Sequence, residues 1–509
     1  MSHGTSLYEH VRAHLDPSGT GLTEGGDRLP DEDPDPGGLH WAPGAMDGVM
    51  GHHAGSGDAE AELGRVLALL VGTRGRWRRT AARNALYDAL RDGQVLAFVD
   101  ELLARIEDAR DYHDLAAWLV RQGEHREPVK FGMALLGKAA THEDLDVLRV
   151  LGRHEELTLY AAVALARQSD DPEGELWRLA QGVDGWGRIH IIERLSGTER
   201  PEIKAWLLRG GFHNSVMDEY TAYTAATTGD LVAALEGPVD DELLDGAVGI
   251  LRALLAGGPA EDIASYAEGP RALRMVLEHV RRNPTSAEQG LLAHELVRLL
   301  EDEESGRLGH WTPEARAGLL TLAREVLALP DWPGVVEAGL GSDDTFWAAD
   351  QLAGHVGVDT FPALLDRLRR DPFDHYWWQA MRRVDDDRLP ALLDLADEHF
   401  LPSLLGTGAA EEMGFGPMYR QHSALETLVT GLQRFAGSGW PHVRTALSSP
   451  VIRSRNMALN TLADWGSAAW PPDVRTTLEA ALAAEPDDDV RRRIERLLAG
   501  EPLDEDDDF

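Results

Sequence analysis

The chain contains no cysteine. This absence excludes disulfide bridges, iron–sulfur clusters, thiolate-ligated haem and a catalytic thiol. Long hydrophobic runs are missing as well: no stretch reaches about 18 uninterrupted apolar residues, so the sequence predicts no membrane-spanning helix. Residues 1–16 lack the basic segment and apolar core of a signal peptide, and we therefore expect a cytoplasmic protein.

Positive charge is scarce. Lys and Arg together number 49 against 87 Asp and Glu, which gives a formal net charge of −38 at pH 7, and only three of the basic residues are lysine. A surface of this charge repels phosphate backbones and anionic lipids, so we expect neither nucleic acid nor a membrane as a partner. Basic protein surfaces or cations are the partners that such a field favours.

The alternation of apolar and polar residues that is typical of strands is also missing. From residue 58 to residue 500, apolar residues instead recur at spacings of three and four, in runs separated by short Gly, Pro or Asp breaks. A chain of 509 residues exceeds what one ordinary core supports, unless repeats extend that core lengthwise. The pattern predicts an all-α fold.

The helical pattern is repeated. Segments 142–170, 171–198 and 199–229 each read as helix, short turn, helix, and their starts are 28 to 29 residues apart. A helical hairpin cannot bury both faces alone, so neighbouring hairpins must stack. We predict an α-solenoid of stacked antiparallel helix pairs. Its parts are an N-terminal arm with a short helix and a Gly/Pro/Asp-rich segment (1–57), a repeat array (58–405), a Gly-rich inter-helix loop (406–424), C-terminal repeats (425–500) and an acidic tail (501–509).

The C-terminal repeats share a local pattern. Ile452-Arg453 and Val490-Arg491 each follow a proline at a short distance, and each pair is followed by a leucine, Leu459 or Leu497, seven residues after its aliphatic member. This pattern resembles the HEAT-repeat family. The resemblance implies paired helices that stack into a curved solenoid, with a concave surface that often binds other proteins.

Two short blocks carry a second resemblance. "HWAPGAMDGVMGHH" (40–53) and "SSPVIRSRNMALNTLADW" (448–465) are similar to segments of bacterial proteins labelled limonene hydroxylase. The label implies oxidation of a small terpene with a nicotinamide or a metal. The residues do not carry that chemistry, because the chain has no thiolate for haem, no Glu-x-x-His di-iron motif and no Gly-x-Gly-x-x-Gly loop after a strand.

Aromatic residues are concentrated in the C-terminal part. Packing inside and between repeats is the ordinary reason for such a concentration, and a groove for a ligand or partner is the alternative, since rigid aromatics dominate interface hot spots. Adjacent tryptophans cannot share one face of a helix, so one member of the Trp377-Trp378 pair should face a neighbour or a groove. The candidate groove residues are Trp377, Trp378, Phe415, Tyr419 and Trp465.

The segment 40–53 is the one candidate metal site. Its candidate ligands are His40, Asp47, His52 and His53, although adjacent His52 and His53 cannot easily bind the same ion. The alternative is a structural loop, in which Trp41 and Met46 pack on the first helices. We favour the structural loop and expect no cofactor.

Taken together, the patterns favour a non-catalytic HEAT-like scaffold that binds a protein partner in its concave groove. The alternative is a limonene hydroxylase-like monooxygenase, whose substrate would be a small terpene. No catalytic residue is predicted, because no recognised catalytic constellation is present.

Overall fold

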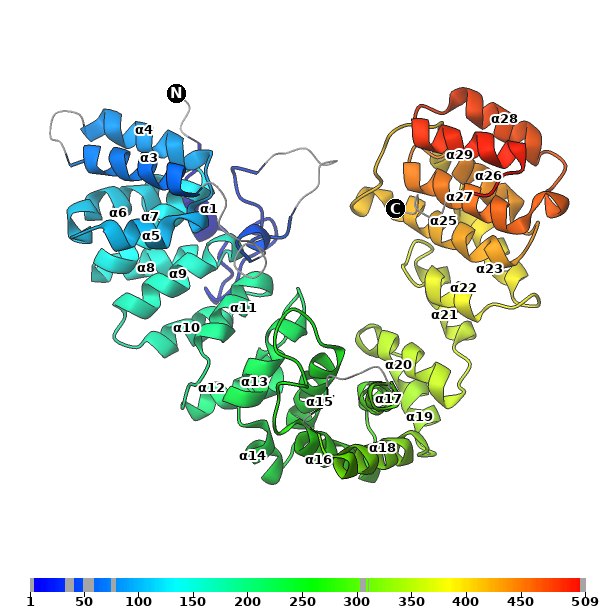
Figure 1. Cartoon of the computed structure of the whole chain (residues 1–509), viewed down its shortest axis with the longest axis horizontal. Coiled ribbons are helices and arrows are strands. Elements are labelled where there is room, and N and C mark those ends of the chain that lie inside the picture. Colours follow the sequence, from blue (N-terminus) through cyan, green and yellow to red (C-terminus); the bar gives the residue numbers. More distant parts are fainter. Residues whose placement is uncertain are drawn as a thin grey trace. The chain divides into compact units, whose positions relative to one another are not determined.

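The computed structural model of the chain describes residues 4–32, 41–48, 59–74, 79–302, 308–309 and 311–503. Within these ranges regular structure is helical, and β-structure is limited to two isolated bridges, Leu15–Leu22 and Glu412–Val451. The prediction of an all-α fold is confirmed. None of the described helices is long and apolar enough to cross a membrane. The helices form two compact units, of which unit 1 ends at Leu352 and unit 2 begins at Ala353 (Figure 1).

Unit 1 is a succession of helices joined by short connections. In chain order they are α1 (Leu7–Ala13), α3 (Ala59–Gly72), α4 (Arg79–Arg91), α5 (Val99–Arg105), α6 (His113–Gln122), α7 (Arg126–Ala139), α8 (His142–Leu151), α9 (Glu155–Gln168), α10 (Pro172–Ala180), α11 (Gly185–Arg194), α12 (Pro201–Trp206), α13 (Ala222–Thr228), α14 (Leu231–Glu236), α15 (Asp241–Ala256), α16 (Gly269–Arg282), α17 (Ala287–Glu301), α18 (Pro313–Leu327), α19 (Trp332–Gly339) and α20 (Asp343–Val356), which crosses the unit boundary. Single turns include η1 (Val95–Ala97), η2 (Ala109–Tyr112), η3 (Leu207–Gly211) and η4 (Asp218–Tyr220).

The starts of these helices follow from local chemistry. At α8, the Thr141 side chain and the Asp144 side chain form a capping box, in which Asp144 accepts hydrogen bonds from the Thr141 N–H at 2.8 Å and from its hydroxyl at 2.7 Å. Asp144 also accepts a 2.7 Å hydrogen bond from Nε2 of His113. The sequence His142-Glu143-Asp144 is therefore a helix start, as its residue types predict.

Helices of unit 1 pack on their sequence neighbours and on the helices two positions away. The long inner series runs from α7 to α9, α11, α13, α15 and α17, each in contact with the next (Figure 1). The alternate helices α6, α8 and α10 pack against members of this series. Each helix of this series therefore buries its apolar stripe against two or more others.

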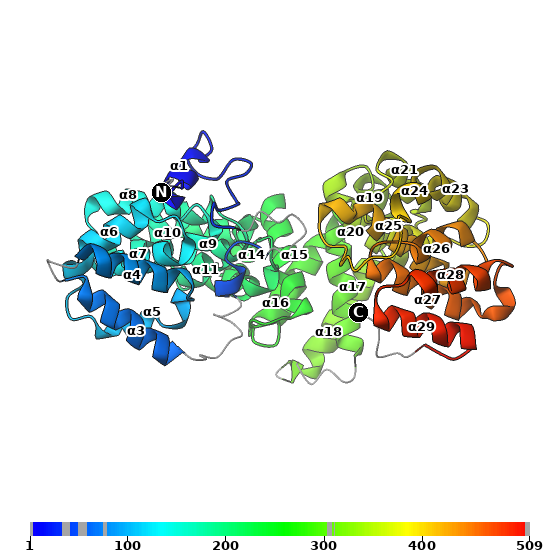
Figure 2. The ribbon, with the colours of Figure 1, turned by 90° about the horizontal axis from the view of Figure 1, so that it is seen from above.

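The described part of the N-terminal arm lies on the first helices of unit 1. Helix α1 packs against α6 and α8, and the Leu7 N–H donates a 2.9 Å hydrogen bond to the Gly123 carbonyl (Figure 2). Further along the arm, Asp31 accepts a 2.8 Å hydrogen bond from the Arg126 N–H. The composition of the arm predicts that it cannot fold alone, and in the structure its described residues contact these helices.

Unit 2 contains the remaining helices. They are α21 (Phe361–Arg370), α22 (Trp377–Arg383), α23 (Leu389–His399), α24 (Pro402–Leu405), α25 (Arg420–Gly431), α26 (Trp440–Leu447), α27 (Ile452–Trp465), α28 (Val474–Ala484) and α29 (Asp488–Ala499). Residues 406–416 between α24 and the single turn η6 (Pro417–Tyr419) contain no helix. In α29 the buried residues Val490, Arg493, Ile494 and Leu497 follow the spacing of one helical face.

Candidate functional site

Hydrogen bonds connect the N-terminal ends of the alternate helices α9 and α11 and the loop that precedes η4 in unit 1. Glu155, the first residue of α9, accepts a 2.8 Å hydrogen bond from the backbone N–H of Asp184, which precedes α11. Asp184 in turn accepts a 2.9 Å hydrogen bond from the backbone N–H of Ser215. Each carboxylate thus binds an amide in the connection two helices further along the chain, where no intrahelical acceptor is available.

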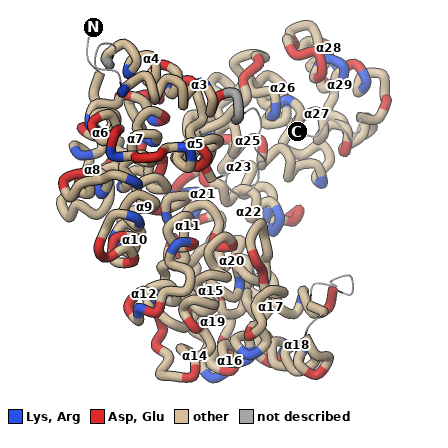
Figure 3. The backbone as a smooth tube through the Cα atoms, turned by 60° about the vertical axis from the view of Figure 1, so that its left-hand side comes forward, with Lys and Arg blue, Asp and Glu red and all other residues tan. Residues whose placement is uncertain are grey.

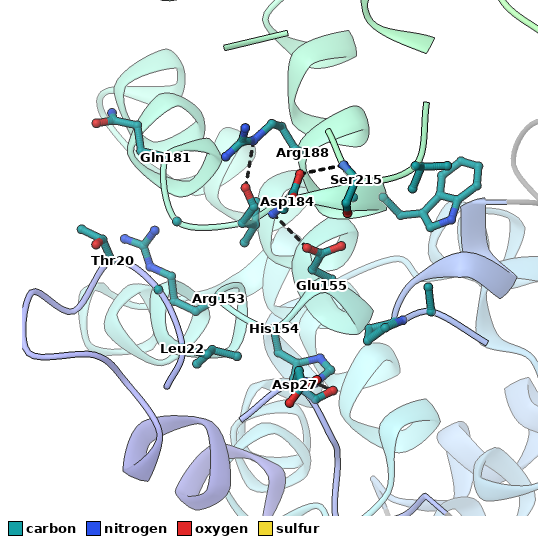
Figure 4. Close-up of a pocket in the computed structure, with 18 of the residues that line it drawn as sticks. Thr20, Leu22, Asp27, Arg153, His154, Glu155, Gln181, Asp184, Arg188 and Ser215 are labelled. Carbon is teal, nitrogen blue, oxygen red and sulfur yellow. Dashed lines mark hydrogen bonds between the residues drawn. The ribbon is translucent and has the colours of Figure 1, made fainter. Parts of the chain in front are cut away.

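A cleft of about 510 Å³ opens beside these carboxylates, and we call it the arm cleft (Figure 4). The N-terminal arm forms one wall and the ends of α9 and α11 form the other. The lining residues labelled in Figure 4 are Thr20, Leu22, Asp27, Arg153, His154, Glu155, Gln181, Asp184, Arg188 and Ser215. The cleft therefore has mixed charge and two cationic side chains.

Both arginines of the arm cleft hold backbone segments. Nη1 of Arg153 donates a 2.9 Å hydrogen bond to the carbonyl of Arg178, and burial lowers the pKa of Arg153. Arg188 donates through Nε to the carbonyl of Val183 and through Nη1 to the carbonyl of His213, both at 2.9 Å. These contacts fix the loops between helices, so the arginines have structural roles.

His154 ties the arm to α9 as a neutral side chain. Burial lowers its pKa to about 4, so the imidazole is uncharged at neutral pH. Its Nδ1 accepts a 3.2 Å hydrogen bond from the Glu156 N–H, which leaves Nε2 to carry the proton and to donate to the Asp27 carbonyl at 3.0 Å. The histidine therefore binds the arm without placing a charge in the cleft.

Glu155 is the carboxyl of this cleft that changes charge near neutral pH. Burial raises its pKa to about 7, against hydrogen bonds from the amides of Asp184 and Gly187 that favour the ionised form. The folded protein consequently retains a proton that the unfolded chain, with an ordinary pKa of 4.5, has already lost.

Glu155→Gln is expected to change how stability depends on pH. Because the folded pKa of Glu155 is raised, its contribution is fully present below about pH 4.5 and is lost as the pH rises through about 7. Across this pH window, the free energy of unfolding of the wild type should fall by at most about 3 kcal/mol relative to that of the variant. Urea unfolding at several pH values between 5 and 8 measures the difference. The exposed Glu143→Gln of α8 is the control, and a parallel pH profile for wild type and Glu155→Gln would contradict the assignment.

A second and larger cavity, of about 800 Å³, adjoins the arm cleft. Val216 lines both cavities. The walls of this second cavity come from the loop 213–219, from α15 and α17 and from the start of α20. We call it the acidic groove, because six carboxylates and two guanidiniums line it: Asp218, Glu219, Glu242, Asp245, Glu288 and Glu295, with Arg209 and Arg252.

Both guanidiniums of the acidic groove are paired with its carboxylates. Arg252 forms ion pairs with Glu288 and Glu295, and the Nη2 atom of Arg252 lies 2.6 Å from Oε1 of Glu295. Arg209 lies within 3.9 Å of Glu242 and also pairs with Asp240. The lining therefore carries a net excess of negative charge, in keeping with the prevalence of acidic side chains along the chain (Figure 3).

Two large apolar side chains are exposed in the acidic groove. Trp347 on α20 is 45% exposed, and Met217, in the loop before η4, is 40% exposed. Exposed tryptophan beside carboxylates suits a cationic side chain with an apolar stem, because the ring face attracts the cation and the carboxylates neutralise it. This combination makes the acidic groove the strongest candidate for a binding site in unit 1.

The aromatic residues proposed from the sequence do not form one groove. Trp377 and Trp465 are buried, and the indole N–H of Trp465 donates a 2.8 Å hydrogen bond to the Leu432 carbonyl, so both are core residues of unit 2. Trp378 and Phe415 are each 50% exposed, and Tyr419 is partly exposed. The two adjacent tryptophans point in different directions: Trp377 is buried and Trp378 is half-exposed, and the prediction that one of them faces a neighbour or a groove stays a prediction.

The candidate metal ligands are placed only in part. Among the residues that the structure describes, no group of three or more His, Asp and Glu side chains is arranged to hold a metal ion. His40, His52 and His53 lie outside the described residues. Asp47 is buried, and its Oδ2 lies 2.8 Å from Nζ of Lys130, so in the structure this carboxylate is the partner of a lysine.

The prediction that Trp41 and Met46 anchor the arm is wrong. Trp41 is 64% exposed and Met46 is 42% exposed. Small residues make the contact instead: Ala45 joins a buried cluster with Trp186, and a side chain at Gly48 would overlap the Trp186 ring. Close approach of the backbone to an aromatic ring requires this glycine, and the two large side chains point away from that contact.

The sequence did not identify the residues that hold the arm. Nζ of Lys130 on α7 lies 2.6 Å from Glu156, 2.8 Å from Asp47 and 2.9 Å from Glu127. Burial opposes the charged lysine, but the three carboxylates together raise its pKa above the ordinary value. Glu156 also accepts a 2.8 Å hydrogen bond from the Gly44 N–H. Lysine is scarce in the sequence, but this scarcity does not distinguish Lys130 from Lys138 or Lys204.

Comparisons of the chain with protein-family models, with curated proteins and with solved structures find no match.

Proposed function

We propose that the protein is a non-catalytic scaffold, built as a HEAT-like α-solenoid, that binds a basic segment of a partner protein in the acidic groove. The observation that carries the proposal is the exposed Trp347 in a groove whose carboxylates outnumber its guanidiniums six to two.

Several hydrogen bonds join residues that are one helix pair apart in the sequence, and they support the repeat architecture. Arg200 pairs with Asp171 and Arg388 with Asp359, in each case across 29 residues. The hydrogen bond from the Trp465 side chain to Leu432 spans 33 residues. Such spacings are expected where each helix pair stacks on the next one along the chain.

The charge of the groove supports a basic partner. An acidic or phosphorylated segment would be repelled by the six carboxylates, whereas arginine or lysine side chains would find unneutralised acceptors there. Exposed Trp347 and Met217 add apolar area, which a flat ionic surface lacks. The geometry adds no observation that favours the hydroxylase alternative, which stays a prediction.

Two variants test the site with a fluorescein-labelled octa-arginine peptide and the full chain. Trp347→Ala and Glu242→Lys are each expected to lower the affinity for the peptide by about tenfold, because each removes a contact of the groove. Fluorescence anisotropy measures this affinity. The matched controls are Trp378→Ala, which removes an equally exposed tryptophan of unit 2, and Glu398→Lys, which changes the net charge by the same amount. The controls should change the affinity by less than about twofold.

The controls separate site binding from general attraction to a chain of charge −38. Equal weakening by Glu242→Lys and Glu398→Lys would mean that the peptide binds through net charge, and the acidic groove would then not be its site. Binding that survives Trp347→Ala unchanged would contradict the role of the tryptophan. Raising the salt concentration should weaken the wild-type complex, because exposed charges are screened.

A further inference from the structure

A third cavity, of about 260 Å³, lies among α5, α7, α9 and α11 of unit 1, apart from both sites above. Six aliphatic residues line it, including Leu103, Ala134, Leu159 and Val163, and five charged side chains line it together with Tyr160 and His190. Leu103, Ala134 and Leu159 are buried in the core. We call this cavity the apolar pocket.

A tyrosine hydroxyl in the wall lacks a hydrogen-bond partner among the residues that the structure describes. Tyr160 lines the apolar pocket from α9, and its side chain is buried. Its hydroxyl has no hydrogen-bond partner among the residues that the structure describes. Burial raises the pKa of Tyr160 well above the usual value, so the hydroxyl keeps its proton and remains a donor. A buried hydroxyl without an acceptor is unfavourable, and an acceptor atom inside the pocket would remove that cost.

The charges around the pocket balance. The lining contains Arg167 and Arg194 as well as Asp100 and Glu193, of which Arg194 and Glu193 lie 4.0 Å apart, and Asp47 of the lining is paired with Lys130. A charged ligand would therefore find no net counter-charge, whereas a neutral ligand would bury its surface against the aliphatic wall.

The size of the cavity limits the ligand. A cavity of about 150 Å³ holds one benzene ring, so about 260 Å³ holds a single ring with several substituent atoms. We propose that the apolar pocket binds a small neutral molecule of this size, whose carbonyl oxygen accepts a hydrogen bond from Tyr160. This site is independent of the acidic groove, so either proposal can fail alone.

Two probes of matched shape test the proposal on the full chain. Acetophenone carries the carbonyl, and α-methylstyrene replaces the carbonyl oxygen with a methylene group. Titration calorimetry should show saturable binding of both, with acetophenone several-fold to tenfold tighter because only it accepts the Tyr160 hydrogen bond. The infrared carbonyl stretch of bound acetophenone should shift to lower frequency.

Three variants locate the binding. Tyr160→Phe should abolish the preference for acetophenone and the infrared shift of its carbonyl, and it should still bind α-methylstyrene. It should fold with at least wild-type stability, since it removes an unpartnered buried hydroxyl. Val163→Phe should lower the affinity for both probes at least tenfold, because the larger side chain fills the cavity. Tyr223→Phe, a partly buried tyrosine of α13 outside the pocket lining, should change neither.

Each of three results would contradict the proposal. Absence of saturable binding for both probes would mean that the cavity is only a packing gap. A preference for acetophenone that persists in Tyr160→Phe would mean that another group donates the hydrogen bond, and undiminished binding to Val163→Phe would place the probes elsewhere.

Discussion

Lys130→Met is expected to lower the free energy of unfolding of unit 1 by about 3–5 kcal/mol. The Lys130 side chain is 2% exposed and lies within 2.9 Å of three carboxylates, those of Asp47, Glu127 and Glu156. Methionine nearly matches the volume of lysine but carries no charge. The buried carboxylates of Asp47 and Glu156 and the partly buried one of Glu127 would lose their common counter-charge, and leaving buried charges uncompensated is among the costliest single changes in a protein. Urea unfolding at pH 7, followed by circular dichroism, measures the loss.

The same variant should loosen the arm. Asp47 pairs with Lys130, and the Gly44 N–H donates to Glu156 in the same cluster. Hydrogen exchange of residues 41–48 should therefore become faster in Lys130→Met than expected from the loss of global stability. The cost should also shrink as the pH falls, because burial raises the pKa of Asp47 and protonation removes one of the unpaired charges.

Lys204→Met is the matched control. Lys204 is another of the three lysines, and its partners Glu199 and Asp230 are exposed. Ion pairs of this kind contribute about 0–1 kcal/mol, so the control should lose no more than that. Similar losses in the two variants would show that the buried cluster does not hold unit 1 together.

The sequence predicts helices well because their signal is local. Apolar residues at spacings of three and four define one face, and the buried positions Val490, Ile494 and Leu497 of α29 follow that spacing. The helix start at Thr141 is also predicted by residues within one turn. Both signals lie within the segment that they describe, so no knowledge of the rest of the chain is needed.

The Lys130 cluster has no such local signal. Glu127 and Lys130 are three residues apart, which on an isolated helix is typical of a solvent-exposed ion pair. The other partners come from distant segments, Asp47 in the arm and Glu156 in the next but one helix, α9. Helical spacing identifies neighbours within a helix, and it does not identify which segment covers that helix.

The aromatic residues show the same limit. Spacing requires that Trp377 and Trp378 point in different directions, and they do, but it does not say which one is buried. Phe346 and Trp347 form a comparable adjacent pair in α20, where Phe346 is buried and Trp347 is exposed. The local pattern does not distinguish Trp347, because the carboxylates that line the same cavity lie on the distant helices α15 and α17.

Arg455→Leu is expected to lower the free energy of unfolding of unit 2 by about 3–5 kcal/mol. Arg455 on α27 and Glu485 before α29 are each about 1% exposed at the side chain, and they form a two-point contact with N–O distances of 2.7 and 2.8 Å. Arg455 also donates a 2.8 Å hydrogen bond to the Ser449 carbonyl. The variant leaves Glu485 charged and buried, which is far less favourable than an exposed carboxylate without a partner.

A double variant distinguishes the loss of the pair from the loss of packing. Arg455→Leu with Glu485→Leu removes both charges, and it should recover a large part of the stability that Arg455→Leu loses, because no uncompensated charge remains. Arg444→Leu, which removes a half-exposed partner of Asp473, should cost no more than about 1 kcal/mol. If Arg455→Leu proves no more costly than Arg444→Leu, the buried pair contributes little to unit 2. If the double variant recovers nothing, the loss comes from the packing of α27 against α29.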